Sequence, residues 1–264
     1  MHDVYEKLKN AQRIVVKVGT STLTYETGKL NLSRMDRLAM ILSDLHNRGK
    51  EVILVSSGAI GVAVGKLGLS EKPTETRYKQ AVAAVGQCEL MFLYDKLFSE
   101  YNNTVAQILL TREDVTGTKR RQNTRNTFNT LLEMGIIPIV NENDTISVEE
   151  IEFGDNDTLS AIVAEFVEAD LLVLFSDIDG FYDKDPHVSD DAKLIDCVTD
   201  IKSVRSLAGG VGSNRGTGGM ITKLDAAEIA TGAGINMVIT NGENIDGLYE
   251  ILEGKKVGTV FVAK

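Results

Sequence analysis

The sequence predicts an open αβα sandwich, in which a mostly parallel central sheet carries helices on both faces. Apolar strand-like runs alternate with helical patterns along the chain of 264 residues. Several runs are apolar at consecutive positions, as in "EVILVSS" (51–57), which is typical of parallel strands buried on both faces. The ligands of such sheets bind beyond the carboxyl ends of the strands, so polar residues at those ends are the candidates for function.

The predicted elements follow in chain order. The strands are expected at 13–21, 51–57, 104–111, 136–143, 171–177, 236–240 and 259–263. The helices between them are expected at 33–49, 77–100, 119–134, 157–169 and 220–233. In the first helix Ser33 suits the N-cap and Gly49 the C′ position. Only 147–154, "SVEEIEFG", breaks the alternation, and its period of two predicts a hairpin beyond the sheet.

The composition of the chain excludes several classes of protein. The net charge of −10 argues against a general nucleic-acid binder. No apolar run reaches membrane-spanning length, and the charged N-terminus lacks a signal segment. Cys88 and Cys197 are far apart and in no metal-like spacing, as expected of reduced thiols in a cytoplasmic protein. We expect one domain over 1–264, with an amino-acid half to about residue 170 and a nucleotide half after it.

The first strand carries a lysine, Lys17, inside "IVVKV". A lysine in a doubly buried strand is costly, so this segment is equally compatible with an edge strand that leaves Lys17 in solvent. The following Gly19, Thr20 and Ser21 favour function, because a tight turn with N–H groups and hydroxyls beside a lysine suits a phosphate. The second strand ends similarly in "SSGAIGVAVG" (56–65), although glycines there could serve packing alone.

Two acidic, amide-rich loops surround the end of the fourth strand, "NENDT" (141–145) and "GDNDT" (154–158). Asp155 or Asp157 could simply cap the following helix, but capping does not explain six Asn and Asp residues. A calcium loop is excluded, because the required Asp series with a Glu twelve residues along is missing. Recognition of a small molecule with an ammonium and a carboxylate fits better.

The glycine-rich region at 209–223 matches neither the P-loop nor the dinucleotide-binding fingerprint. In "GTGGMITK" (216–223) Thr222 and Lys223 stand in the wrong order for a P-loop. The glycines at 210, 212 and 216 miss the dinucleotide fingerprint by one residue. A loop, a helix N-terminus and Lys223 can still bind a phosphate. "FSDIDGFYDKDP" (175–186), with Ser176 and Asp177, ends another strand and could equally be an ordinary acidic loop.

Together, "VVKVGTS", "VSSGAIGVAVG", "AAVGQ", "PIVNENDT", "FGDNDTLSA", "LFSDIDGFYDKDP" and "GTGGMITKLDAA" resemble the glutamate 5-kinases of the amino acid kinase superfamily. The motifs occur in order from about Arg13 to the C-terminus. The resemblance implies phosphorylation of the side-chain carboxylate of L-glutamate by ATP with Mg²⁺, the first step of proline biosynthesis. It also implies a homo-oligomer and inhibition by L-proline. Many bacterial relatives continue into an RNA-binding-like domain, which is not expected in this sequence.

Residue roles implied by the resemblance fall into two groups. Glutamate is bound by Ser57, Asn141, Asp144 and Asn156. Lys17 contacts the ATP phosphates, Lys223 lies at the transferring phosphoryl group, and Asp157 helps to hold both lysines. The nucleotide also meets a larger set of residues, namely Ser176, Asp177, Thr217, Gly218, Gly219, Met220, Ile221, Thr222 and Lys223. No residue is expected to bind a metal by itself.

Several alternatives share the predicted fold. Related kinases phosphorylate acetylglutamate, aspartate, carbamate or a nucleoside monophosphate. Asp144 argues against an N-acylated substrate, which offers no ammonium. A non-catalytic amino acid sensor is the alternative from another class, and the presence of both Lys17 and Lys223 argues against it.

Overall fold

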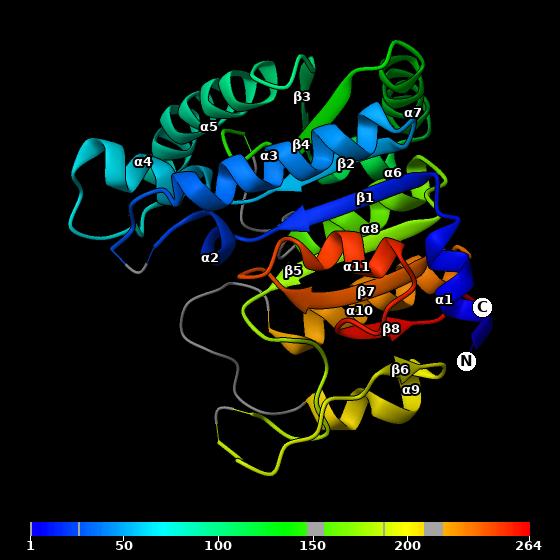
Figure 1. Ribbon diagram of the computed structural model, residues 1–264. Coiled ribbons are helices and arrows are strands. Elements are labelled where there is room, and N and C mark those ends of the chain that lie inside the picture. Colours follow the sequence, from blue (N-terminus) through cyan, green and yellow to red (C-terminus); the bar gives the residue numbers. More distant parts are fainter. Residues whose placement is uncertain (1, 26, 147–155, 187, 209–218) are drawn as a thin grey trace.

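The computed structural model describes residues 2–25, 27–146, 156–186, 188–208 and 219–264. These residues form a central sheet with helices on both faces (Figure 1). The predicted hairpin at 147–154, Asp155, and the glycine-dense stretch 209–218 lie outside the described residues. No helix among the described residues is both long and apolar enough to cross a membrane.

Within the described residues the sheet has eight strands, in the order β3-β4-β2-β1-β5-β7-β8-β6. Their bounds are β1 Arg13–Val18, β2 Glu51–Ser56, β3 Val105–Leu110, β4 Ile137–Glu142, β5 Leu171–Ser176, β6 Cys197–Val198, β7 Asn236–Asn241 and β8 Thr259–Phe261. All neighbouring pairs are parallel except β7 with β8. The predicted mostly parallel sheet is therefore confirmed, and β6 is a strand that the sequence did not predict.

Helices cover the two faces of the sheet (Figure 1). Core residues of α1, α3, α5 and α11 pack on one face, and those of α6, α7, α8 and α10 on the other. The helix bounds are α1 His2–Lys9, α2 Thr20–Leu23, α3 Leu32–Asn47, α4 Ala59–Leu67, α5 Thr76–Ser99, α6 Arg112–Thr116, α7 Thr118–Glu133, α8 Asn156–Phe166, α9 Ile201–Val204, α10 Met220–Gly232 and α11 Gly247–Leu252, with a 3₁₀ helix at Arg205–Ala208.

β1 lies in the middle of the sheet, between β2 and β5. Its residues alternate between the faces, so that Val16 joins the core beneath α3 and Val15 joins the core beneath α8. Lys17 follows the same alternation and points toward the α8 face, where it is 7% exposed. The edge-strand alternative is therefore excluded.

One predicted helix start was wrong. The N-cap of α3 is Asn31, whose side-chain oxygen accepts from the backbone N–H of Arg34, and Ser33 lies inside the helix. Asn is at least as good an N-cap as Ser, and its position two residues earlier satisfies the first free N–H groups of the helix. The other end was predicted correctly, because Gly49 has a φ of +86° immediately after the helix.

Candidate functional site

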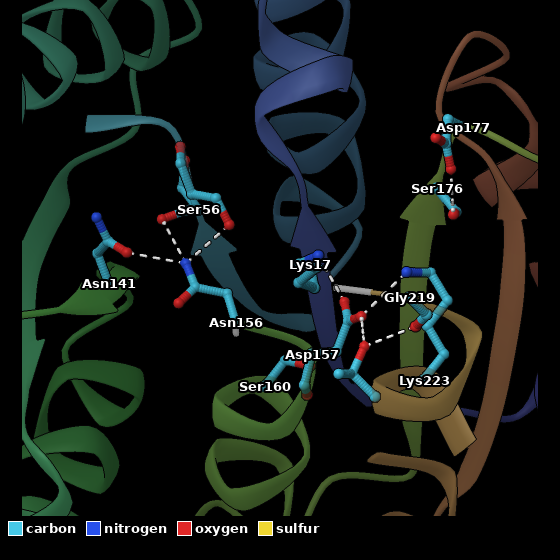
Figure 2. Close-up of polar contacts among 12 residues, drawn as sticks. Lys17, Ser56, Asn141, Asn156, Asp157, Ser160, Ser176, Asp177, Gly219 and Lys223 are labelled. Carbon is cyan, nitrogen blue, oxygen red and sulfur yellow. Dashed lines mark hydrogen bonds and ion pairs between the residues drawn. The ribbon is translucent and has the colours of Figure 1, made fainter. Parts of the chain in front are cut away.

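Buried polar side chains gather where β1, β2, β4 and β5 end (Figure 2). The parallel pairing of these strands places their carboxyl ends at one edge of the sheet. Lys17, Asp157 and Lys223 are at most 7% exposed there. Charged residues are rarely buried unless they are paired, so this edge is the first place to look for chemistry.

The three charged side chains form one cluster, in which the carboxylate lies between the two lysines (Figure 2). Lys17 Nζ is 2.5 Å from Asp157 Oδ1, and Lys223 Nζ is 3.0 Å from Asp157 Oδ2. The lysines come from β1 and α10, and Asp157 is the second residue of α8. Two ammonium groups and one carboxylate give this triad a charge of +1. A site of this kind attracts an anion such as a phosphate.

The start of α10 adds polar groups beside the triad. Gly219 is the N-cap of α10 and has extended backbone with no side-chain cap. Thr222 Oγ1 lies 2.7 Å from the Gly219 carbonyl oxygen and 3.2 Å from Asp157 Oδ2. The N–H groups of a helix start, together with a buried lysine in the first turn, form a phosphate-binding arrangement without a P-loop.

The loops after β1 and β2 lie against each other. Gly58 has a φ of +102°, a conformation that favours glycine, and it caps α4. A Cβ at Gly61 would come within 3.1 Å of the Thr20 side chain, so α4 begins directly beside the turn that follows β1. The backbone N–H of Ser57 donates to Val18 O at 3.1 Å. Glycine at these positions therefore allows the two turns to pack closely at this edge.

An amide cluster lies beside the triad (Figure 2). Asn156 Nδ2 donates to Ser57 Oγ at 2.8 Å, to Asn141 Oδ1 at 2.9 Å and to Ser56 O at 3.3 Å. Asn141 Nδ2 in turn donates to Gln87 Oε1 at 2.9 Å. Asn156 and Asp157 are consecutive, so the first turn of α8 joins the amide cluster to the charged triad.

Ser176 and Asp177 lie at the end of β5, on the side of β1 away from the amide cluster (Figure 2). Ser176 Oγ donates to Asp177 Oδ1 at 3.1 Å, and the Ser176 carbonyl accepts from Gly242 N at 2.7 Å. Asp177 is exposed. The carboxylate at this strand end is therefore accessible from solvent.

The structure brings most of the predicted site residues together. Asp157 is not a simple helix cap, because its carboxylate contacts both lysines from inside α8. Asp144 is half-buried in the turn after β4. In the predicted nucleotide run, Met220 is half-buried and Ile221 is exposed, whereas Thr217 and Gly218 lie outside the described residues.

Sequence reasoning assigned no role to Gln87, although "AAVGQ" was among the motifs. The residue is 7% exposed and contacts the amide cluster. A long polar side chain in the middle of an apolar helical segment, directly after a glycine, was the available signal.

Comparisons with known proteins show the family of this chain. The model of the amino acid kinase family matches residues 12–241. A glutamate 5-kinase of Clostridium perfringens is 59% identical over 97% of both chains, and one of Clostridium tetani is 58% identical over 98% of this chain and 97% of its own. Among solved structures, the UMP kinase of Bacillus anthracis has a TM-score of 0.66 at 18% identity, covering 96% of this chain and 97% of its own, which shows the common fold.

Proposed function

We propose that this chain, which belongs to the amino acid kinase family and within it to the glutamate 5-kinases, transfers the terminal phosphoryl group of ATP to the side-chain carboxylate of L-glutamate. The product is L-glutamyl 5-phosphate, and the reaction is the first step of proline biosynthesis. The observation that carries the proposal is the buried Lys17–Asp157–Lys223 triad beside an amide cluster, at the carboxyl edge of a parallel sheet.

The two lysines bind the phosphates. Phosphoryl transfer is catalysed mainly by positioning and by neutralising charge, and two buried ammonium groups do both. We assign Lys17 to the phosphates of ATP and Lys223 to the transferring phosphoryl group. Asp157 holds the ammonium groups close together against their mutual repulsion, as its contacts of 2.5 and 3.0 Å support.

The amide cluster binds the amino acid. We assign Ser57, Asn141 and Asn156 to glutamate because they form one hydrogen-bonded group at the ends of β2 and β4 and at the start of α8. Asp144 is assigned to the α-ammonium group, because a carboxylate in the turn after β4 forms a charge-assisted hydrogen bond with a cation.

The nucleotide lies across the ends of β5 and the start of α10. We assign Ser176 and Asp177 to it from β5 and Gly219 to Lys223 from the start of α10, and Thr217 and Gly218 lie outside the described residues. In this arrangement the strands β1 to β4 serve the amino acid and β5 to β8 serve the nucleotide, which matches their separation on the two sides of the β1–β5 junction.

The chemistry requires no general base. A carboxylate is already ionised and nucleophilic at neutral pH, so the obstacle is its approach to a polyanion. The triad reduces this obstacle because it brings an excess positive charge into a site that is shielded from water.

Kinases use ATP together with a divalent cation. The described residues contain no group of three His, Cys, Asp or Glu side chains that could hold a metal ion, and the side chains at the phosphate site are lysines. We therefore propose that Mg²⁺ enters as its ATP complex, held by phosphate oxygens and water. Bound in this way, it neutralises part of the phosphate charge.

We also propose a cytoplasmic homo-oligomer. Both cysteines are free thiols, and Cys88 is exposed, which suits a reducing compartment. Tyr78, Val85 and Phe92 are exposed at intervals of seven residues along α5. Such an interval places apolar groups on one helix face, which supports burial against a second copy.

The activity is tested by ADP release from Mg-ATP with a panel of acceptors. L-glutamate should be turned over far faster than L-aspartate, N-acetylglutamate, carbamate or a nucleoside monophosphate. Equal turnover of N-acetylglutamate would contradict the proposal, because that compound lacks the ammonium group for which Asp144 is assigned. A chain that binds glutamate but never releases ADP would instead be a sensor.

A further inference from the structure

The motif "AAVGQ" places Gln87 of α5 against the amide cluster. A Cβ at Gly86 would lie 1.7 Å from the carbonyl oxygen of Ala59, so only glycine allows α5 to touch the first residue of α4. Gln87 follows directly and is thereby held against the end of β4. Its Oε1 accepts a buried hydrogen bond of 2.9 Å from Asn141 Nδ2.

The backbone fixes the direction of this hydrogen bond. The N–H of Glu142 donates to Asn141 Oδ1 at 2.9 Å, and a backbone N–H can only donate. The oxygen of the Asn141 amide must therefore face Glu142 N, and its NH₂ group must face Gln87. Gln87 satisfies that buried NH₂ group by presenting its own oxygen, and an apolar side chain at position 87 would leave a buried donor without an acceptor.

The orientation of the Asn141 amide also determines which atoms of Asn156 and Ser57 can face a ligand. Asn141 Oδ1 also accepts from Asn156 Nδ2, which donates as well to Ser57 Oγ. The Asn156 NH₂ group is therefore used within the protein, and its Oδ1 is the atom left to accept from a ligand. Ser57 Oγ accepts from Asn156, so its own proton is left to donate.

We infer that Gln87 is a positioning residue that stabilises the polarity which the Glu142 N–H imposes on the amino-acid site. By accepting from Asn141 it helps to hold Asn156 so that an acceptor oxygen faces the ammonium group of the substrate. It also leaves the Ser57 hydroxyl as a donor for a carboxylate. The inference rests on the proposed function to the extent that the ligand is an α-amino acid.

The test compares two substitutions at this position. Gln87→Met keeps the length of the side chain and removes the acceptor, and Gln87→Glu keeps an acceptor oxygen in the same place. Gln87→Met should raise the KM for L-glutamate roughly tenfold, because a buried donor loses its acceptor. The kcat and the KM for ATP should stay within about twofold, because the triad is untouched. Gln87→Glu should restore most of the affinity for glutamate.

The matched control is Gln122→Met, at an exposed glutamine of α7 that contacts Asn126. It should leave all three kinetic constants unchanged. If Gln87→Met left the KM for glutamate unchanged, the inference would be wrong. It would also be wrong if the KM for ATP rose and kcat fell to the same extent, because that pattern indicates general loosening of the α4–α5 contact.

Calorimetric titration with L-glutamate separates this inference from the proposed function. If the wild-type chain binds glutamate but phosphorylates a different acceptor, the proposed function is wrong. The comparison of Gln87→Met with Gln87→Glu then decides the inference from the dissociation constant for glutamate. If the wild-type chain binds no α-amino acid, both are wrong.

Discussion

From the charges of the triad we predict that Asp157 contributes more to the stability of the fold than Lys17 does. Asp157→Asn keeps the shape of the side chain but leaves two buried ammonium groups facing a neutral amide. Lys17→Met removes one ammonium group and leaves the Asp157–Lys223 ion pair, at 3.0 Å, electrically balanced. The first change should destabilise the fold strongly and the second should not, whereas both should abolish most activity.

The magnitude follows from the geometry. At about 3 Å and an effective dielectric constant of about 20, each attraction to Asp157 is worth about 5 kcal/mol, much of which offsets the desolvation of the ions. Removing the shared partner of buried charges typically costs about 3–5 kcal/mol. We therefore expect Asp157→Asn to lower the free energy of unfolding by about 3 kcal/mol or more and Lys17→Met by less than about 1 kcal/mol.

The assay is urea-induced unfolding followed by circular dichroism. With a slope of about 3 kcal/mol per M urea, a loss of about 3 kcal/mol moves the midpoint by about 1 M. Asp191→Asn is the control, because it removes an exposed ion pair to Lys184 and should not move the midpoint. Equal destabilisation by Lys17→Met and Asp157→Asn would refute the reasoning, since it would show that the triad acts as packing rather than as a charge balance.

Three further predictions concern the site and its support. Lys223→Met should lower kcat roughly 100-fold while leaving the KM for glutamate nearly unchanged in initial-rate assays, and a wild-type kcat would remove Lys223 from the phosphate site. Gly86→Ala should destabilise the fold by more than about 3 kcal/mol in urea unfolding, because its Cβ would meet the Ala59 carbonyl, whereas Gly232→Ala, with nothing within 4 Å, should stabilise it slightly. L-proline should inhibit competitively with glutamate, and Asp144→Asn should weaken both ligands by roughly tenfold or more, so inhibition that excess glutamate does not relieve would place proline elsewhere.

The strands were the most predictable part of the fold. Runs such as Leu171–Ser176 are apolar on both faces, which few structures other than a buried parallel strand require. The two-residue strand β6 was not predictable, because Cys197 and Val198 are too few to show a period. A helix was expected after the second strand, but its bounds could not be given, since Gly61 and Gly65 are poor helix formers and are explained only by close packing against Thr20 and Gly28.

The site was predictable as a set of residues and not as an arrangement. The sequence placed Lys17 near a strand end but could not decide whether that strand lay at an edge, because the answer depends on pairing with Val55 and Leu174, which are 38 and 157 residues away. The position of Asp157 at a helix start was equally compatible with capping until the lysines were placed. Gln87 was missed because its partner, Asn141, is 54 residues distant in the chain.

The sheet order places the charged triad at the boundary between the two proposed halves of the site. Lys17 comes from β1, at the boundary of the proposed amino-acid half, and Lys223 comes from α10, in the proposed nucleotide half. Asp157 holds both from α8, which packs against β1, β5 and α10. Its neighbour Asn156 belongs to the amide cluster that is proposed to bind the amino acid. With these proposed assignments the first turn of α8 connects the two substrate pockets, and we expect it to set the distance between the attacking carboxylate and the phosphoryl group that it receives.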